Sequence, residues 1–298
     1  MKTAEQKRLD FHAKLASGKI MVVPSVYDAL CGRIAQEAGI ECLVMGGYAI
    51  EASRLAQPDV GLLSLSEMTE ALKQICDATD IPVIGDGDTG YGNALNVIRT
   101  VQEYEHAGAA CIFLEDQVWP KRCGHMEGKQ VIDAHEHAQK IRAACDARLD
   151  KNFAIMARTD SRAIYGLDDA IERGKMYADA GADLLFVEAM RDRSEMEKVA
   201  HAFEGSGVKL VGNMIEGGKT PLIKADELEQ MGYSVVFWAC TSLYLVSKAL
   251  YEAFSTLKKE GTTESFADKM IDFPQFNHFV GLDTYKELER KYKVDRDD

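Results

Sequence analysis

Short apolar runs alternate along the chain with longer segments in which apolar residues recur every three or four positions. The short runs are typical of buried strands, and the longer segments are typical of amphipathic helices. Three of the helical segments end in an Ala-Gly pair just before a strand (Ala38-Gly39, Ala107-Gly108 and Ala180-Gly181), which is a common helix stop. The predicted strands are Ile20–Val23, Cys42–Met45, Pro82–Gly85, Cys111–Leu114, Phe153–Ala157, Leu184–Val187, Leu210–Gly212 and Ser234–Phe237. The predicted helices are Ala29–Ala38, Glu67–Thr79, Leu95–Ala107, Ala134–Arg148, Leu167–Ala180, Ser194–Glu204, Lys224–Met231 and Leu243–Lys258.

Eight strand–helix units in one chain favour an α/β fold in which a parallel sheet closes into a (β/α)8, TIM-like barrel. A doubly wound open sheet is the alternative, because it is built from the same units. No linker rich in Pro, Gly or Ser divides the sequence, so residues 1–298 are predicted to form a single barrel domain. After Gly261 the pattern changes to two short helical pieces around a break at Phe273-Pro274. This predicts a C-terminal extension, from about 259 to 298, that caps the barrel or packs on a neighbouring subunit.

Composition narrows the class of protein and its partners. The net charge of −13 argues against nucleic acid or an anionic membrane as a partner, but a local cation cluster or a bound metal still allows an anionic substrate. The seven cysteines include no Cys-x-x-Cys pair, which favours buried thiols in a reducing compartment. The N-terminus has no apolar signal core, and no run reaches the 18 to 20 or so apolar residues of a membrane span. We therefore expect a cytoplasmic protein.

A segment rich in chemistry, residues 118–128, follows the fourth predicted strand. Pro120 and Gly124 indicate a loop, which carries the cations Lys121 and Arg122, the thiol of Cys123 and the imidazole of His125. Nearby cations stabilise the thiolate form of a cysteine, and a cysteine in that setting is suited to proton transfer or nucleophilic attack. The alternative is a solvated surface loop with an incidental cysteine.

Acidic side chains follow neighbouring predicted strands, at the barrel end where active sites gather. Asp86 and Asp88 follow the third strand and Glu115 follows the fourth, so their oxygens predict a site for Mg²⁺ or Mn²⁺. A single Asp-Gly is more often a turn, but three acids at adjacent strand ends repel one another and need a cation or protons. Asp59, in a loop, is a possible fourth acid.

Arg158 ends the fifth predicted strand, where its guanidinium is well shaped to hold a carboxylate. The alternative is an ion pair with Asp160 or Glu188. Of the histidines, only His125 is a site candidate. The structural ones are taken to be His106, His135, His137, His201 and His278.

These motifs together resemble the isocitrate lyase/phosphoenolpyruvate mutase superfamily over nearly the whole chain. The resemblance rests on Ser25-Val-Tyr-Asp-Ala-Leu30, Asp86-Gly-Asp-Thr-Gly-Tyr-Gly92, Glu115-Asp-Gln117, Lys121-Arg-Cys-Gly-His125, Ala157-Arg-Thr-Asp160 and Asn213-Met-Ile-Glu-Gly-Gly-Lys-Thr-Pro221. It implies a TIM-like barrel whose eighth helix is exchanged between subunits, a homotetramer, and a requirement for Mg²⁺ or Mn²⁺. Cys123 resembles the proton donor of the carbon–carbon lyases, since the phosphonate enzymes carry an Asn-Ser type sequence there. The motif that starts at Asn213 looks more like the group of 2,3-dimethylmalate lyase, oxaloacetate hydrolase and petal death protein.

The resemblance also implies roles for individual residues. Asp86 would bind the metal directly, with Asp59, Asp88 and Glu115 acting largely through water. The implied substrate-binding residues are Gly46, Gly47, Tyr48, Gly124, Arg158, Glu188 and Asn213. Two departures concern the substrate: Gly46-Gly47 stands where relatives often have Ser-Gly, and Trp238, where relatives often have Pro, should reshape one wall of the pocket.

The expected reaction is a metal-assisted cleavage of a 2-hydroxy dicarboxylate such as 2,3-dimethylmalate, giving pyruvate and propionate. Arg158 fixes a carboxylate, and Cys123 protonates the leaving fragment, with Lys121, Arg122 and His125 stabilising charge. Asp59 and Tyr48 are candidates for the base. Oxaloacetate hydrolysis and 2-methylisocitrate cleavage are the rival reactions, and a non-catalytic ligand-binding barrel is the rival from another class.

Overall fold

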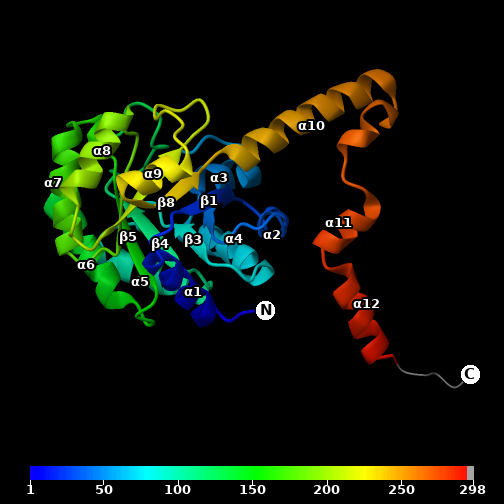
Figure 1. The fold of residues 1–298 in the computed structure, drawn as a ribbon, viewed down its shortest axis with the longest axis horizontal. Helices are drawn as coiled ribbons and strands as arrows, with labels where there is room; N and C mark the ends of the chain where they lie inside the picture. Colours follow the sequence, from blue (N-terminus) through cyan, green and yellow to red (C-terminus); the bar gives the residue numbers. More distant parts are fainter. Residues whose placement is uncertain (294–298) are drawn as a thin grey trace, which may run out of the picture.

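The computed structural model describes residues 1–293. All eight predicted strands form, and they pair in chain order as a closed parallel barrel in which β8 also pairs with β1 (Figure 1). The open-sheet alternative is therefore excluded. The strands are β1 Met21–Val26, β2 Leu43–Met45, β3 Val83–Asp86, β4 Cys111–Glu115, β5 Ala154–Thr159, β6 Leu184–Val187, β7 Lys209–Met214 and β8 Tyr233–Trp238.

Alternate residues of each strand point to the barrel axis or to the surrounding helices, as the two-residue period of a strand requires. The inward set forms its own buried cluster, whose aromatic members Phe113, Phe186 and Phe237 pack with ring centroids 5.7–6.2 Å apart. The outward set packs against the helices in a second and larger cluster. The barrel is thus filled by side chains up to the level of these three rings.

The helices that cover the barrel follow the predicted segments closely. Several begin at a side-chain cap, such as Ser64 and Glu67, which form a reciprocal capping box at the start of α4. The predicted helices are observed as α2 Ala29–Glu37, α4 Leu65–Ala78, α5 Ala94–His106, α6 Ala134–Ala147, α7 Leu167–Asp179, α8 Arg193–Ala202, α9 Ala225–Met231 and α10 Thr241–Glu260.

Two helices lie outside the predicted set, and each has a clear place in the barrel. Helix α1 (Ala4–Ala16) closes the amino end of the barrel, because its Phe11 and Leu15 are buried in the same cluster as the inward residues of β1. Helix α3 (Gly47–Leu55) begins directly after β2 at the opposite, carboxyl end. Its amino terminus therefore lies at the mouth of the barrel.

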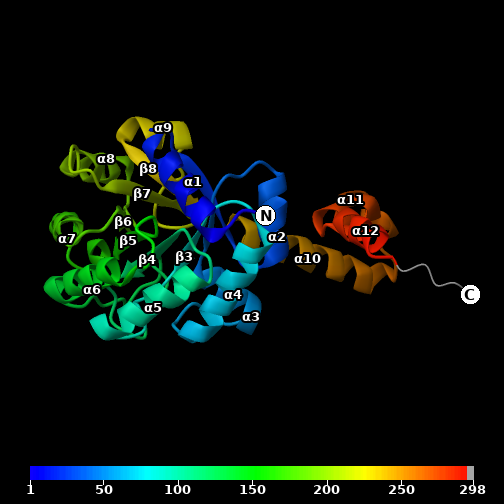
Figure 2. The same cartoon turned by 90° about the horizontal axis from the view of Figure 1, so that it is seen from below.

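The C-terminal part of the chain leaves the barrel. Helix α10 runs outward from the barrel (Figures 1 and 2). None of its residues is buried, and Leu245, Tyr251 and Phe254 are 66%, 76% and 62% exposed. A short 3-10 turn, η2 (Glu264–Lys269), precedes α11 (Phe273–Phe279) and α12 (Leu282–Lys291). Pro274 lies at the start of α11, where proline fits the first helical turn. Within residues 1–293, no helix is long and apolar enough to cross a membrane.

Candidate active site

A ring of eight inward positions surrounds the barrel axis at the carboxyl ends of the strands, one level above the three phenylalanines. Each member is the next inward residue of its strand or lies just beyond the strand end, so the strand period alone brings the ring together. The ring consists of Ser25, Gly46, Asp86, Glu115, Arg158, Glu188, Asn213 and Ala239. All except Glu115 line a cavity of about 60 Å³, to which Tyr48, Asp59, Cys123 and Gly124 also contribute.

Asp86 is fixed in this cavity by backbone donors. Its Oδ2 accepts the Gly47 N–H (2.8 Å) and its Oδ1 accepts the Asp88 N–H (3.0 Å). Burial and the nearby Asp88 carboxylate raise the pKa of Asp86 to about 6. Asp88 itself has a left-handed backbone (φ 47°), an uncommon conformation for a non-glycine residue. The acids are therefore held close together by the backbone despite their repulsion.

Lys121 enters from the loop and neutralises part of this negative charge. Its Nζ lies 2.5 Å from Asp59 Oδ1 and 2.7 Å from Asp88 Oδ1, and all three side chains are 4% exposed. Burial alone would lower the pKa of Lys121, but Asp88 and Asp59 outweigh it and raise that pKa well above its ordinary value. Lys121 thus serves as a permanent cation among the acids rather than as a neighbour of the thiol.

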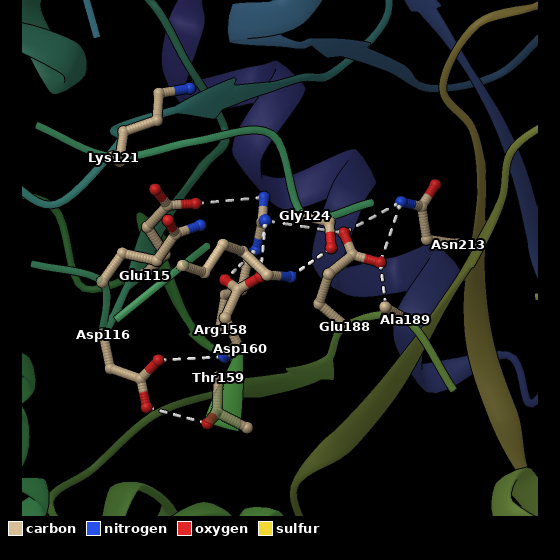
Figure 3. Close-up of polar contacts among 12 residues, drawn as sticks. Glu115, Asp116, Lys121, Gly124, Arg158, Thr159, Asp160, Glu188, Ala189 and Asn213 are labelled. Carbon is tan, nitrogen blue, oxygen red and sulfur yellow. Dashed lines mark hydrogen bonds and ion pairs between the residues drawn. The ribbon is translucent and has the colours of Figure 1, made fainter. Parts of the chain in front are cut away.

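Arg158 is surrounded by carboxylates (Figure 3). Its Nη1 lies 3.1 Å from Glu115 Oε2, its Nε lies 2.9 Å from Asp160 Oδ2, and its Nη2 lies 3.6 Å from Glu188 Oε2. Arg158 therefore makes the ion pairs with Asp160 and Glu188 that the sequence offered as the alternative, and its contact with a substrate carboxylate stays a prediction. Because Arg158 also lines the cavity, its buried charge is fixed in orientation beside the place where a substrate would bind.

Cys123 lies in the loop of residues 117–130, called the thiol loop below. Its N–H donates to the Asp59 carbonyl (3.1 Å), and its side chain borders the cavity. Burial and the Asp59 carboxylate raise the pKa of Cys123 to about 12. The expectation that neighbouring cations favour the thiolate is therefore wrong, because Lys121 is engaged with two acids and Arg122 points elsewhere. A neutral thiol is the form that can donate a proton.

The thiol loop is fastened to the barrel mouth at two further points. His125 Nδ1 accepts the Lys219 N–H (2.9 Å), which leaves Nε2 as the protonated nitrogen facing Glu188 Oε1 at 3.1 Å. Lys129 donates to the Gly124 carbonyl and to Asp160 Oδ1. Glu188 therefore stays ionised, since Arg158 and His125 hold its pKa below the ordinary value despite burial.

Gly124 makes this close approach possible. A Cβ built at Gly124 would lie 2.6 Å from Arg158 Nη2, so any larger residue would push the thiol loop away from the cavity. Asn213 donates its amide N–H to Glu188 Oε2 at 3.1 Å, and Tyr48 lies with its hydroxyl 3.4 Å from that of Tyr244.

Two predicted residues lie elsewhere. Arg122 is exposed, and its Nη1 is 3.5 Å from the Glu127 carbonyl, so it does not face the cavity. Trp238 belongs to the outer cluster that packs on the helices, whereas its neighbours Phe237 and Ala239 point inward and line the cavity. The prediction that Trp238 reshapes the pocket is therefore wrong.

Sequence reasoning also missed Ser25 and Lys129. Ser25 follows the inward residues Met21 and Val23 at a spacing of two, a signal that the strand pattern could have given. Nothing local in the sequence marks Lys129 as buried, because its charged partner, Asp160, comes from another segment.

The acids beside the cavity could supply part of the coordination of a divalent cation. Within residues 1–293, no three His, Cys, Asp or Glu side chains converge as a ready-made ligand set. However, Glu115 Oε1 is buried and has no hydrogen-bond partner among these residues. Burial also raises the pKa of Glu115 well above its ordinary value. Carboxylate oxygens of this kind suit Mg²⁺, which often takes one or two protein carboxylates and keeps several waters.

The barrel, the acid cluster at its mouth and the thiol loop define an enzyme of the (β/α)8 class. Residues 11–258 match the family model described as phosphoenolpyruvate phosphomutase. The chain belongs to the phosphoenolpyruvate mutase/isocitrate lyase superfamily. This confirms the resemblance seen in the sequence.

The relatives include lyases and phosphonate enzymes. The chain is 43% identical to a 2,3-dimethylmalate lyase of Eubacterium barkeri (95% of this chain, 96% of that protein). It is 47% identical to a chloroplastic carboxyvinyl-carboxyphosphonate phosphorylmutase of Arabidopsis thaliana (95% and 84%). A solved 2,3-dimethylmalate lyase matches with a TM-score of 0.90 at 34% identity, covering 98% of this chain and 96% of that one. A phosphonopyruvate hydrolase solved with oxalate and Mg²⁺ matches with a TM-score of 0.86 at 27% identity, covering 98% and 100%.

Proposed function

We propose that this enzyme is a divalent-cation-dependent carbon–carbon lyase that cleaves a 2-hydroxy dicarboxylate of the 2,3-dimethylmalate type into pyruvate and propionate. One observation carries the proposal: a neutral thiol, Cys123, borders the same cavity as the acid Asp86 and the cation Arg158. Lyase chemistry needs this combination, because a bond is broken next to a carboxylate and the resulting carbanion must be protonated.

Residues of this chain supply orientation and proton transfer. Arg158 would hold a substrate carboxylate, and Asp86 would be the first ligand of Mg²⁺ or Mn²⁺, which supplies Lewis-acid stabilisation of the 2-oxygen. The substrate hydroxyl loses its proton to a base, for which Asp59 and Tyr48 remain the candidates. The C–C bond then breaks, and the leaving carbon takes the proton of Cys123 Sγ–H. The proton lost by the hydroxyl finally restores the thiol.

The thiol loop would also exclude water from the carbanion. A cavity of about 60 Å³ holds roughly four waters, and a substrate of roughly ten non-hydrogen atoms needs more room than that. The loop must therefore open for entry and close again over the substrate.

The cavity lining favours an alkyl substituent over a third carboxylate. Phe113, Phe186 and Phe237 form its floor, and Arg158 is the one Lys or Arg side chain among the described lining residues. Cleavage of 2-methylisocitrate, as named for a relative at 42% identity, would need a further cation. Oxaloacetate hydrolysis, as named for a solved relative at 32% identity, would need water in the space of the alkyl group. We also propose a homotetramer with exchanged C-terminal helices, which would cover the exposed face of α10, and a cytoplasmic location.

The test is a panel of substrates with Mg²⁺ or Mn²⁺ under reducing conditions. We expect pyruvate release from 2,3-dimethylmalate to exceed release from 2-methylisocitrate and acetate release from oxaloacetate. Cys123→Ala should abolish lyase turnover and leave metal binding intact. The control Cys145→Ala, at a cysteine far from the cavity, should retain lyase turnover. Normal rates in Cys123→Ala would contradict the assigned proton donor, and no turnover of any substrate would favour a non-catalytic binding barrel.

A further inference from the structure

The hydroxyl of Ser25 is a polar group that borders the cavity. Ser25 lies near the end of β1, is 1% exposed, and belongs to the ring that surrounds the barrel axis. Among the described residues, its Oγ has no hydrogen-bond partner. A buried hydroxyl without a partner is unfavourable, so a group that arrives from outside the protein accounts best for its presence.

Gly46 explains the space that this hydroxyl occupies. A Cβ built at Gly46 would lie 3.1 Å from Ser25 Oγ, which is tighter than an ordinary contact. The backbone does not require glycine there, because Gly46 has φ −97° and ψ 135°, values that any residue adopts. The missing side chain at position 46 therefore leaves room for the Ser25 hydroxyl in the same corner of the cavity.

This corner is suited to an anion. Helix α3 has nine residues and begins at Gly47, beside Ser25 and Gly46, so its amino-terminal N–H groups and dipole favour negative charge. The Gly47 N–H already donates to Asp86, which leaves Ser25 as a side-chain donor close to the cation site proposed above. A carboxylate that bridges this corner and the cation would accept the Ser25 hydrogen bond and also bind the cation.

We propose that Ser25 binds a carboxylate of the substrate through its Oγ–H, in the corner that the absent side chain at position 46 leaves open. That the ligand is a carboxylate rests on the proposed function, whereas the pairing of Ser25 with Gly46 rests on geometry. Ser25 is then a specificity-determining residue carried by β1, beside the end of the adjacent strand β2.

Oxalate with Mg²⁺ is the probe, measured by calorimetric titration of the full chain so that binding is observed without turnover. Ser25→Ala should weaken oxalate binding about 10- to 100-fold, as expected for the loss of a hydrogen bond to a charged group. With an active substrate it should raise KM more than it lowers kcat. The paired change Ser25→Gly with Gly46→Ser moves the hydroxyl to the other strand, and should bring oxalate affinity back to within about threefold of the native value.

The outcomes separate this inference from the proposed function. Native affinity in Ser25→Ala overturns the inference, and so does a folded paired variant that binds no better than Ser25→Ala. Weakened oxalate binding in an enzyme that cleaves none of the panel substrates supports the role of Ser25 and refutes the proposed function. Failure of the native protein to bind oxalate with Mg²⁺ overturns both. Circular dichroism and the thermal midpoint establish that each variant is folded.

Discussion

Replacing Lys121 by methionine should destabilise the protein far more than an ordinary lost ion pair. The ammonium lies 2.5 Å from Asp59 Oδ1 and 2.7 Å from Asp88 Oδ1, and each side chain is 4% exposed. Removing one partner of such a buried cluster leaves charges that water cannot solvate, at a cost of about 3–5 kcal/mol. For a chain of this length, each kcal/mol lowers the thermal midpoint by about 2 °C, so we expect a fall of about 6–10 °C.

An exposed pair of the same length is the matched control. Lys73 Nζ lies 2.7 Å from Asp77 Oδ2 on the surface of α4, where both side chains are about 60% exposed. Lys73→Met should leave the midpoint unchanged, since water and salt screen that pair. Mg²⁺ in the millimolar range should restore part of the midpoint of Lys121→Met, because a divalent ion can replace the lost positive charge. Differential scanning calorimetry would refute the reasoning if both variants lost the same few tenths of a degree.

Three further predictions concern the thiol loop, the outer core and the C-terminal helices. Lys129→Met should increase hydrogen–deuterium exchange at Gly124 and along the thiol loop while β5 stays protected; unchanged exchange in the loop would contradict the role of Lys129 as its anchor. Burial, with nearby cations, lowers the pKa of His137 well below its ordinary value, so the unfolded chain binds the extra proton. This residue's contribution is therefore complete above about pH 6.5 and is lost below it at about 1.4 kcal/mol per pH unit. In His137→Leu, the free energy of unfolding by urea should fall less steeply below about pH 6.5 than in the native protein, by about 1.4 kcal/mol per pH unit. The same pH dependence in both proteins would contradict this role of His137. Phe254→Asp, on the exposed face of α10, should reduce the particle mass measured by light scattering from that of the proposed tetramer to a smaller one, whereas an unchanged mass in this variant would speak against helix exchange.

The strands could be predicted from the sequence because their positions depend on local pattern. Buried runs such as Leu184–Val187 are short, apolar and bounded by turn signals, and the observed strand has the same limits as the predicted one. The ring at the barrel mouth follows from those strands, since Asp86, Glu115 and Arg158 continue their inward periods. The barrel topology then brings these residues together in one site, because parallel strands in a closed barrel all end on one face.

The remaining features depend on contacts between distant segments. Helix α1 has weak amphipathic character, and its place under the barrel is fixed by long-range contacts such as Lys7 with the Cys76 carbonyl (2.6 Å). The protonation of Cys123 was predicted wrongly because the sequence shows its cationic neighbours but not that Lys121 turns away to Asp59. Lys121 and Cys123 are thus neighbours in sequence whose charged and thiol groups face different partners.

The charges around the cavity explain why an anionic substrate would require a metal. Acids outnumber cations there, since Lys121 and Arg158 face Asp59, Asp86, Asp88, Glu115 and Glu188. The raised pKa values of Asp86 and Glu115 reflect burial together with this repulsion. A dicarboxylate entering alone would add negative charge to a site that already has an excess, so its affinity should be poor. A divalent cation would reverse the sign locally, so that Arg158, which lines the cavity, could orient the substrate rather than merely neutralise the protein.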